Sequence, residues 1–118
     1  MYTTSSKDGF ICLYILPNKL ISMIKNPYNS YFNHVFLSAN PFPSIITYTK
    51  NEGRFDSYSL SGILIKTIKL NDEKNILIIP LFNVYGGTFK DRIILTYDKH
   101  CQILNVPFFD INEKESIV

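Results

Sequence analysis

A six-residue apolar run, a four-residue turn and a second short strand-like segment occur together three times in this chain. The three copies begin at Phe10, Ser44 and Arg92, so they are spaced by 34 and 48 residues. A β-unit that recurs every few dozen residues is typical of an array such as a propeller. The recurrence therefore predicts several copies of one antiparallel β-unit.

Composition favours the same fold class. The chain of 118 residues contains 17 Ile, 9 Phe and 8 Tyr but a single Ala. Ala is the best helix former, whereas Ile, Tyr and Phe favour strands. AT-rich coding raises Ile, Asn, Lys, Tyr and Phe together, so it contributes to this bias as an alternative cause. The length corresponds to one domain.

Nine strands are expected between turns that lie about 8–12 residues apart, a spacing typical of a sandwich, barrel or propeller. Glycine, proline and asparagine mark the turns, as at Pro17-Asn18, Asn51–Gly53 and Ser61-Gly62. The expected strands are Phe10–Ile15, Leu20–Ile24, His34–Ser38, Ser44–Thr49, Arg54–Leu60, Ile63–Leu70, Asn75–Leu81, Arg92–Tyr97 and Gln102–Val106.

Several of these strands are apolar on both faces, at Ile45-Ile46, Ile76–Ile79 and Ile93–Leu95. A strand covered on both sides has this pattern. A helix is the rival interpretation of a short apolar run. The β-branched residues and the close spacing of Gly and Pro favour strands.

No motif in the sequence predicts catalysis or metal binding. His34 and His100 have no second ligand at a helical or hairpin spacing. A hydrolase using Asp98, His100 and Cys101 is one alternative, but no nucleophile elbow accompanies them. The dispersed carboxylates show no pairing that would suggest glycosidase or two-metal chemistry. They are Asp56, Asp72, Asp91, Asp98 and Asp110. We expect no catalytic residue and no metal ligand.

Cofactor and nucleic-acid sites are not expected either. The segment Tyr85–Lys90 contains two glycines, but it lacks the Gly-Lys-Ser/Thr ending of a phosphate loop. The net charge is +2, with only two Arg, which is too small and too scattered for a polyanion partner. Aromatic residues lie near Lys25, and a mixture of aromatic and basic side chains can bind single-stranded nucleic acid. Packing of these rings inside the protein is the simpler interpretation. These aromatic residues are Tyr28, Tyr31, Phe32 and Phe36.

Cys12 and Cys101 fit two buried free thiols better than a disulfide, because their spacing matches no disulfide framework. The apolar run Phe10–Leu16 ends at Pro17 and is too short for a signal sequence or a membrane span. Any membrane contact is therefore expected to be peripheral.

The segment from Ser38 to Leu70 places a Pro-hydrophobic-Pro phrase before an apolar strand with a tyrosine, followed by a short turn and a Tyr-Ser-hydrophobic-Ser-Gly phrase. These residues are Pro41–Pro43, Ile45, Ile46, Tyr48 and Tyr58–Gly62. The segment resembles a blade from the C-terminal WD-repeat propeller of BEACH-domain proteins, the neurobeachin and lysosomal-trafficking-regulator group. The stretch Asp91–Phe109 resembles the next blade and ends on Val106, Pro107 and Phe108.

The resemblance implies an all-β fold of two to three antiparallel blades of a WD-repeat-like β-propeller. The propeller would be incomplete, because a blade takes about 40–45 residues and propellers close with four or more. We expect one all-β segment over 1–118, with approximate blades at 1–37, 38–74 and 75–112 and a polar tail at 113–118. The chain would then be a fragment of a longer propeller.

The same resemblance implies a non-catalytic protein-interaction scaffold in vesicle or lysosome-related membrane trafficking. It would be cytoplasmic, and peripheral to intracellular membranes at most through the full-length protein. Partners would be other proteins, not nucleic acid, bound through blade loops. Exposed loop positions include Asn51, Glu52, Tyr85, Lys90 and Asp98. One alternative is a self-contained small β-sandwich or barrel that binds a ligand or a protein. Another is an accidental resemblance produced by composition.

Overall fold

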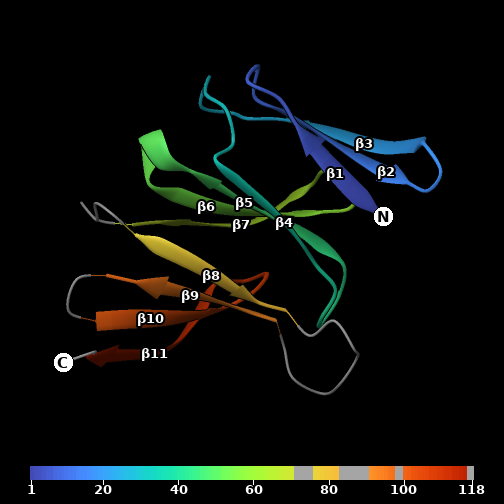
Figure 1. Ribbon diagram of the computed structural model, residues 1–118. Helices are drawn as coiled ribbons and strands as arrows, with labels where there is room; N and C mark the ends of the chain where they lie inside the picture. The colour runs from blue at the N-terminus through green and yellow to red at the C-terminus, as the bar shows by residue number, and fades with distance from the viewer. Residues whose placement is uncertain (71–75, 83–90, 98–99, 117–118) are drawn as a thin grey trace.

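The computed structural model describes residues 1–70, 76–82, 91–97 and 100–116, and this part of the chain forms three antiparallel sheets (Figure 1). The predicted all-β class is confirmed. Helical structure in the described residues consists of one 3-10 turn, η1 (Lys50–Glu52).

Each sheet is made of strands that are consecutive in the chain. The N-terminal sheet holds β1 (Tyr2–Ser5), β2 (Phe10–Ile15) and β3 (Lys19–Lys25). The middle sheet holds β4 (His34–Ser38), β5 (Ser44–Thr49), β6 (Arg54–Ser59) and β7 (Leu64–Lys69). The C-terminal sheet holds β8 (Leu77–Leu81), β9 (Arg92–Thr96), β10 (His100–Asn105) and β11 (Asp110–Ser116).

The three repeated units of the sequence form equivalent hairpins, β2–β3, β5–β6 and β9–β10. Three strands have the predicted bounds, namely β2, β4 and β5. Two strands were not predicted. Strand β1 lies in the polar N-terminal stretch, and β11 reaches Ser116, although a polar tail was expected from residue 113. Both are edge strands of their sheets, and both have largely polar sequences, which a search for apolar runs does not detect.

The sheet boundaries also differ from the expected blades. Strand β4 pairs with β5 in the middle sheet, whereas the sequence had assigned residues 34–37 to the first blade. The break falls instead in the connection 26–33, which contains Pro27 and Asn29, a residue with a positive φ of 54°. The expected start of a strand at Asn75 lies outside the described residues.

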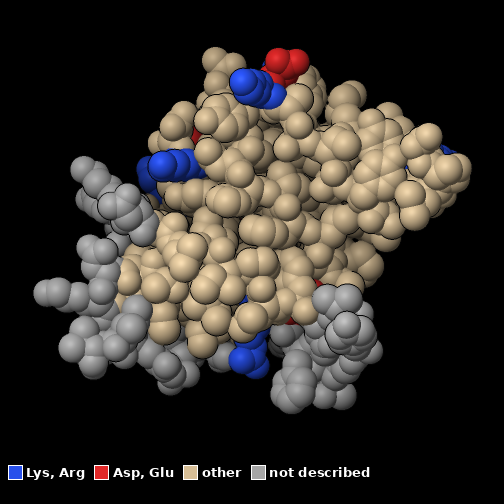
Figure 2. Space-filling view, viewed as in Figure 1, with Lys and Arg blue, Asp and Glu red and all other residues tan. Residues whose placement is uncertain are grey.

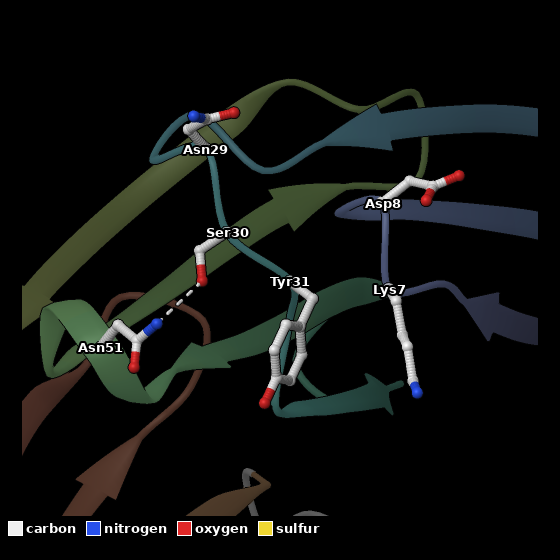
Figure 3. Close-up of a pocket in the computed structure, with 6 residues that line it drawn as sticks. All are labelled: Lys7, Asp8, Asn29, Ser30, Tyr31 and Asn51. Carbon is white, nitrogen blue, oxygen red and sulfur yellow. Dashed lines mark hydrogen bonds between the residues drawn. The ribbon is translucent and has the colours of Figure 1, made fainter.

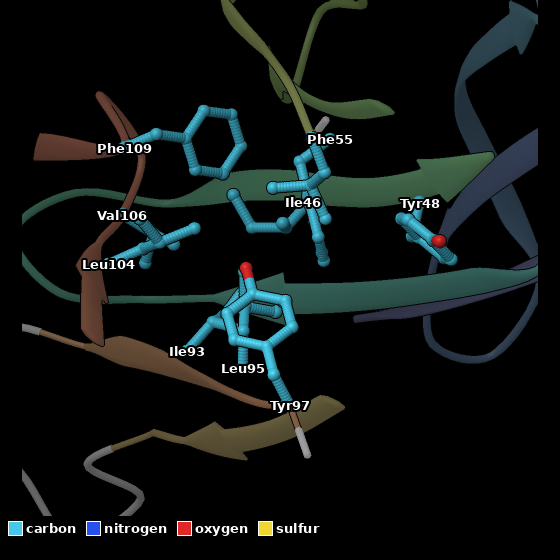
Figure 4. Close-up of a cluster of buried hydrophobic side chains, with 10 residues drawn as sticks. Ile46, Tyr48, Phe55, Ile93, Leu95, Tyr97, Leu104, Val106 and Phe109 are labelled. Atoms are coloured by element: carbon cyan, nitrogen blue, oxygen red, sulfur yellow. The ribbon is translucent and has the colours of Figure 1, made fainter. Parts of the chain in front are cut away.

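The middle sheet is covered on both faces. All six residues of β5 are buried, as the apolar pattern predicted. Neighbouring residues of β5 point in opposite directions. Ile45 packs with Ile11 and Leu13 of the N-terminal sheet, and Ile46 belongs to a second core with the C-terminal sheet (Figure 4). The two outer sheets therefore lie on opposite faces of the middle one.

The two contacts between sheets use different faces of the repeated unit. The second residue of each hairpin is Ile11, Ile45 or Ile93. Ile11 faces the middle sheet and Ile45 faces back toward it, so the first two sheets pack equivalent faces together. Ile93 faces the middle sheet too, but it meets the face of Ile46, which is the opposite face of the unit. In a radial array such as a propeller, every pair of neighbouring sheets packs the same two faces together. The N-terminal sheet is therefore turned over relative to the orientation that such an array would require.

Candidate functional site

Three loops from the N-terminal and middle sheets meet in a polar hollow of about 410 Å³ (Figure 3). One loop is the turn between β1 and β2, the second is the connection from β3 to β4, and the third is η1 between β5 and β6. The side chains that line the hollow are Lys7, Asp8, Asn29, Ser30, Tyr31 and Asn51. Residues far apart in the sequence are thus gathered at one end of two sheets.

Gly9 allows the first two loops to touch. It has a φ of +84°, and a Cβ built on it would lie 2.3 Å from the backbone oxygen of Ser30. The N–H of Asn26 donates to the Gly9 carbonyl at 2.6 Å. Only glycine fits such a close approach in this backbone region without strain.

The third loop is attached by asparagine side chains. The backbone N–H of Lys50 donates to Oδ1 of Asn33 at 2.7 Å, and the Asn33 N–H donates to the Tyr48 carbonyl at 2.8 Å. In the hollow itself, Nδ2 of Asn51 donates to Oγ of Ser30 at 3.4 Å. The loops of the two sheets are therefore hydrogen-bonded to one another.

The hollow offers mixed chemistry. Tyr31 is 47% exposed and supplies an aromatic ring with a hydroxyl group. Lys7 and Asp8 carry opposite charges, and in Figure 3 their side chains point in different directions. The amide groups of Asn29 and Asn51 and the hydroxyl group of Ser30 complete the surface. An aromatic side chain surrounded by hydrogen-bonding groups is suited to contact with another protein.

A buried polar group lies on the face of β6 toward the N-terminal sheet. Asp56 is 1% exposed, and Oγ1 of Thr67 donates to its Oδ1, while its Oδ2 has no hydrogen-bond partner among the described residues. Burial raises the pKa of Tyr58, and the nearby Asp56 charge raises that pKa further. The Arg54 guanidinium lies 4.2 Å from the ring centre of Tyr28 in the β3–β4 connection. Burial, followed by Asp56, raises the pKa of Tyr28. The contact between Arg54 of β6 and Tyr28 helps to hold the β3–β4 connection against β6.

The histidines considered from the sequence pack against aromatic rings. His34 stacks on Phe36 with ring centres 5.9 Å apart, and His100 lies 4.3 Å from the ring centre of Tyr97. Cys101 follows His100 in β10, so the two side chains point to opposite faces. Asp98, the third residue of the alternative hydrolase site, lies outside the described residues.

The remaining candidates do not converge. Asp91 is structural: its Oδ2 accepts hydrogen bonds from Oγ of Ser38 at 2.8 Å and from the N–H groups of Ala39 at 3.0 Å and Asn40 at 3.2 Å. Asp72 and the segment Tyr85–Lys90 lie outside the described residues. In the part of the chain that the structure describes, no group of three or more His, Cys, Asp or Glu side chains could hold a metal ion.

The aromatic residues near Lys25 have separate roles. Phe32 is buried in the core between the N-terminal and middle sheets, and Phe36 packs against the other core. Tyr31 lines the hollow. Cys12 and Cys101 are free thiols, and both are half-buried rather than buried as expected. Across residues 1–70, 76–82, 91–97 and 100–116, no helix has the length and apolar character that a membrane span requires.

Of the exposed loop positions named from the sequence, Asn51 lines the hollow and Glu52 beside it is half-buried. Sequence reasoning missed Lys7, Asp8, Asn29 and Ser30. The phrase Ser-Lys-Asp-Gly at residues 6–9 was a usable signal, because Asp-Gly marks a hairpin turn. No family model, curated protein or solved structure matches this chain. The resemblance to BEACH-type propellers therefore remains a prediction.

Proposed function

We propose that the chain is a non-catalytic protein-binding module whose partner contacts the loop hollow between the N-terminal and middle sheets. The observation that carries this proposal is the meeting of three loops, fixed by Gly9 and Asn33, around the exposed ring of Tyr31. Loops held on a rigid sheet scaffold are the usual place for binding residues.

The finer proposal is a segment of a WD-repeat-like propeller from a BEACH-type scaffold of vesicle or lysosome-related trafficking, cytoplasmic and at most peripheral to membranes. Two observations support it. The middle and C-terminal sheets are four-stranded, with strands in consecutive order, and they pack opposite faces of the repeated unit together. The WD-repeat motif, the trafficking role and the protein partners come from the resemblance of residues 38–70 and 91–109.

The experiment is affinity capture from a cell extract on the immobilised full chain, read by quantitative mass spectrometry. The double variant Tyr31→Ala, Asn51→Ala removes the ring and the amide from the hollow. The control Lys66→Ala changes an exposed residue of β7 that does not line the hollow. We expect proteins that the wild type and Lys66→Ala enrich equally and that the double variant loses by about tenfold, or about 1.4 kcal/mol. Equal capture by all three chains would contradict the proposal.

A second candidate is a self-contained β-module, and the turned N-terminal sheet favours it. The N-terminal and middle sheets pack their equivalent faces together, and each sheet buries the apolar face of the other, as in a two-sheet sandwich. Size-exclusion chromatography with light scattering separates the two candidates. A self-contained module elutes as a monomer and unfolds cooperatively, whereas a propeller segment associates through uncovered apolar surface.

A further inference from the structure

Within the described residues, the N-terminal sheet has one strand fewer than the other two. In the repeated hairpins, β3 corresponds to β6 and β10, which are followed in their sheets by the neighbouring strands β7 and β11. In the described part of the chain β3 pairs with β2 alone. The position that a fourth strand fills in two sheets is thus open beside β3.

The backbone of β3 is prepared for another strand. The Asn26 N–H donates to the carbonyl oxygen of Gly9, which precedes β2. Every second residue of a strand directs its backbone groups to the same side, so Ile24 and Ser22 also direct theirs toward β2. Hydrogen-bonding groups of successive strand residues point to opposite sides. The N–H and C=O groups of Met23 and Lys25 therefore point away from β2, toward the open edge.

Apolar side chains flank this edge. Met23 is 59% exposed and Leu20 is 51% exposed. On the inner side, Oγ of Ser22 donates to the Leu60 carbonyl at 2.7 Å, which brings the β6–β7 turn against β3. The residues that follow this turn are Ile63, 68% exposed, and Leu64, 53% exposed. An added strand would meet apolar surface on both of its faces.

The ends of β3 are basic. Lys19 begins the strand, and Lys25 ends it beside a hollow of about 270 Å³ that Asn26, Pro27 and Asn29 also line. In the view of Figure 2, charged side chains form only a few separate groups around a broad uncharged surface. A peptide with carboxylates near its two ends and apolar residues between them would complement this edge in charge and polarity.

We propose that the open edge of β3 binds an extended segment of another protein as a fourth antiparallel strand, with alternate apolar residues and an acidic residue near each end. Main-chain hydrogen bonds to Met23 and Lys25 give the affinity, and Leu20 and Met23 receive the alternate apolar side chains, as in β-augmentation generally. Lysines at a sheet edge can also prevent pairing with another strand. The experiment therefore distinguishes an edge that binds a strand from an edge that excludes one.

The probe is a fluorescent peptide of sequence Glu-Val-Thr-Val-Thr-Val-Glu with blocked ends, titrated with the full chain and followed by anisotropy. Met23→Pro removes the N–H that faces the open edge and leaves the groups paired with β2 in place. Met23→Thr keeps that N–H and serves as the matched control. We expect Met23→Pro to weaken binding at least tenfold and Met23→Thr to stay within about threefold.

Hydrogen exchange supplies the second measurement. Bound peptide should slow exchange of the Met23 and Lys25 amides, with little change in β7. A peptide with Gln in place of both Glu should bind more weakly at low salt. Lack of binding at millimolar concentration, equal affinity of Met23→Pro, or equal affinity of the Gln peptide would overturn the proposal. So would a dimer of the chain alone that Met23→Pro abolishes, because the occupant would then be a second copy.

Discussion

The two faces of the middle sheet differ in chemistry as well as in geometry. Toward the C-terminal sheet, the buried residues form an apolar core that contains Phe55 and Leu95, and one carboxylate, Asp91, joins the two sheets at its margin. Toward the N-terminal sheet, the core is smaller, and Asp56 and Thr49 are buried beside it. Hydrophobic burial is therefore larger in the contact with the C-terminal sheet, whereas a buried carboxylate, with one oxygen unpaired in the described part of the chain, lies beside the contact with the N-terminal sheet.

The largest expected effect comes from matched core truncations. Leu95 and Leu13 are both 0% exposed, one in each contact. Leu95→Ala should lower the free energy of unfolding by about 4 kcal/mol and Leu13→Ala by about 3 kcal/mol, because the larger core leaves more cavity surface without contacts. Urea unfolding measures both values. Equal losses, or a larger loss for Leu13→Ala, would show that the two contacts do not differ in this way.

The next effect concerns the carboxylate between the middle and C-terminal sheets. Asp91→Ala leaves the hydroxyl of Ser38 and two backbone N–H groups without this acceptor, so it should cost about 3 kcal/mol. Asp91→Asn keeps a carbonyl oxygen at the site and should cost less than half as much. If the two variants are equally stable, the hydrogen bonds to Oδ2 contribute little.

A glycine pair tests the loop contact between the N-terminal and middle sheets. Gly9→Ala adds a clash with the Ser30 carbonyl to the strain of a positive φ, whereas Gly62→Ala, with a φ of +91°, places its Cβ in ordinary contact with Ile24 at 3.5 Å. We expect losses of about 2–3 kcal/mol for Gly9→Ala and about 1 kcal/mol for Gly62→Ala. Thermal unfolding of the two variants provides the measurement. Equal unfolding midpoints for Gly9→Ala and Gly62→Ala would mean that the contact of Gly9 with Ser30 does not hold the loops together.

The smallest expected effect is a loss of folding stability at alkaline pH. Burial raises the pKa of both Tyr58 and Tyr48, and Asp56 adds to the rise only for Tyr58. Below pH 10 the phenol keeps its proton in the folded and unfolded chains, so this contribution is complete. Above pH 10 the unfolded chain loses the proton first, and stability falls as pH rises toward the folded pKa.

Replacement by phenylalanine removes this dependence. Tyr58→Phe should therefore flatten the fall in stability between pH 9.5 and about pH 11 more than Tyr48→Phe does. Urea unfolding across this pH range provides the measurement. The same slope in the wild type and in both variants would remove the buried tyrosines as its cause.

Local pattern was enough to predict much of the fold. The hairpins and the double burial of Ser44–Thr49 follow from β-branched residues between turn residues. The pattern at Ile93–Leu95 was misleading, because Ile94 is only half-buried. Periodicity records which residues are apolar, but it does not say which other sheet covers them.

The turned N-terminal sheet and the candidate site could not be predicted in this way. Which face of β2 meets β5 depends on the path of the connection 26–33, and no local pattern encodes that path. The contact of Gly9 with Ser30 is likewise set by tertiary packing. The Asp-Gly turn could have located one loop of the hollow, but not the other two.

The consecutive order of strands within every sheet has a consequence for biosynthesis. Among the described strands, none pairs with a segment from a distant part of the chain, so each sheet can form as soon as its own residues leave the ribosome. The N-terminal sheet would emerge first and would expose Ile11 and Leu13 until β5 arrives to cover them. The middle sheet in turn would expose Ile46 and Phe55, its part of the larger core, until the C-terminal sheet arrives, so aggregation is a risk in both intervals.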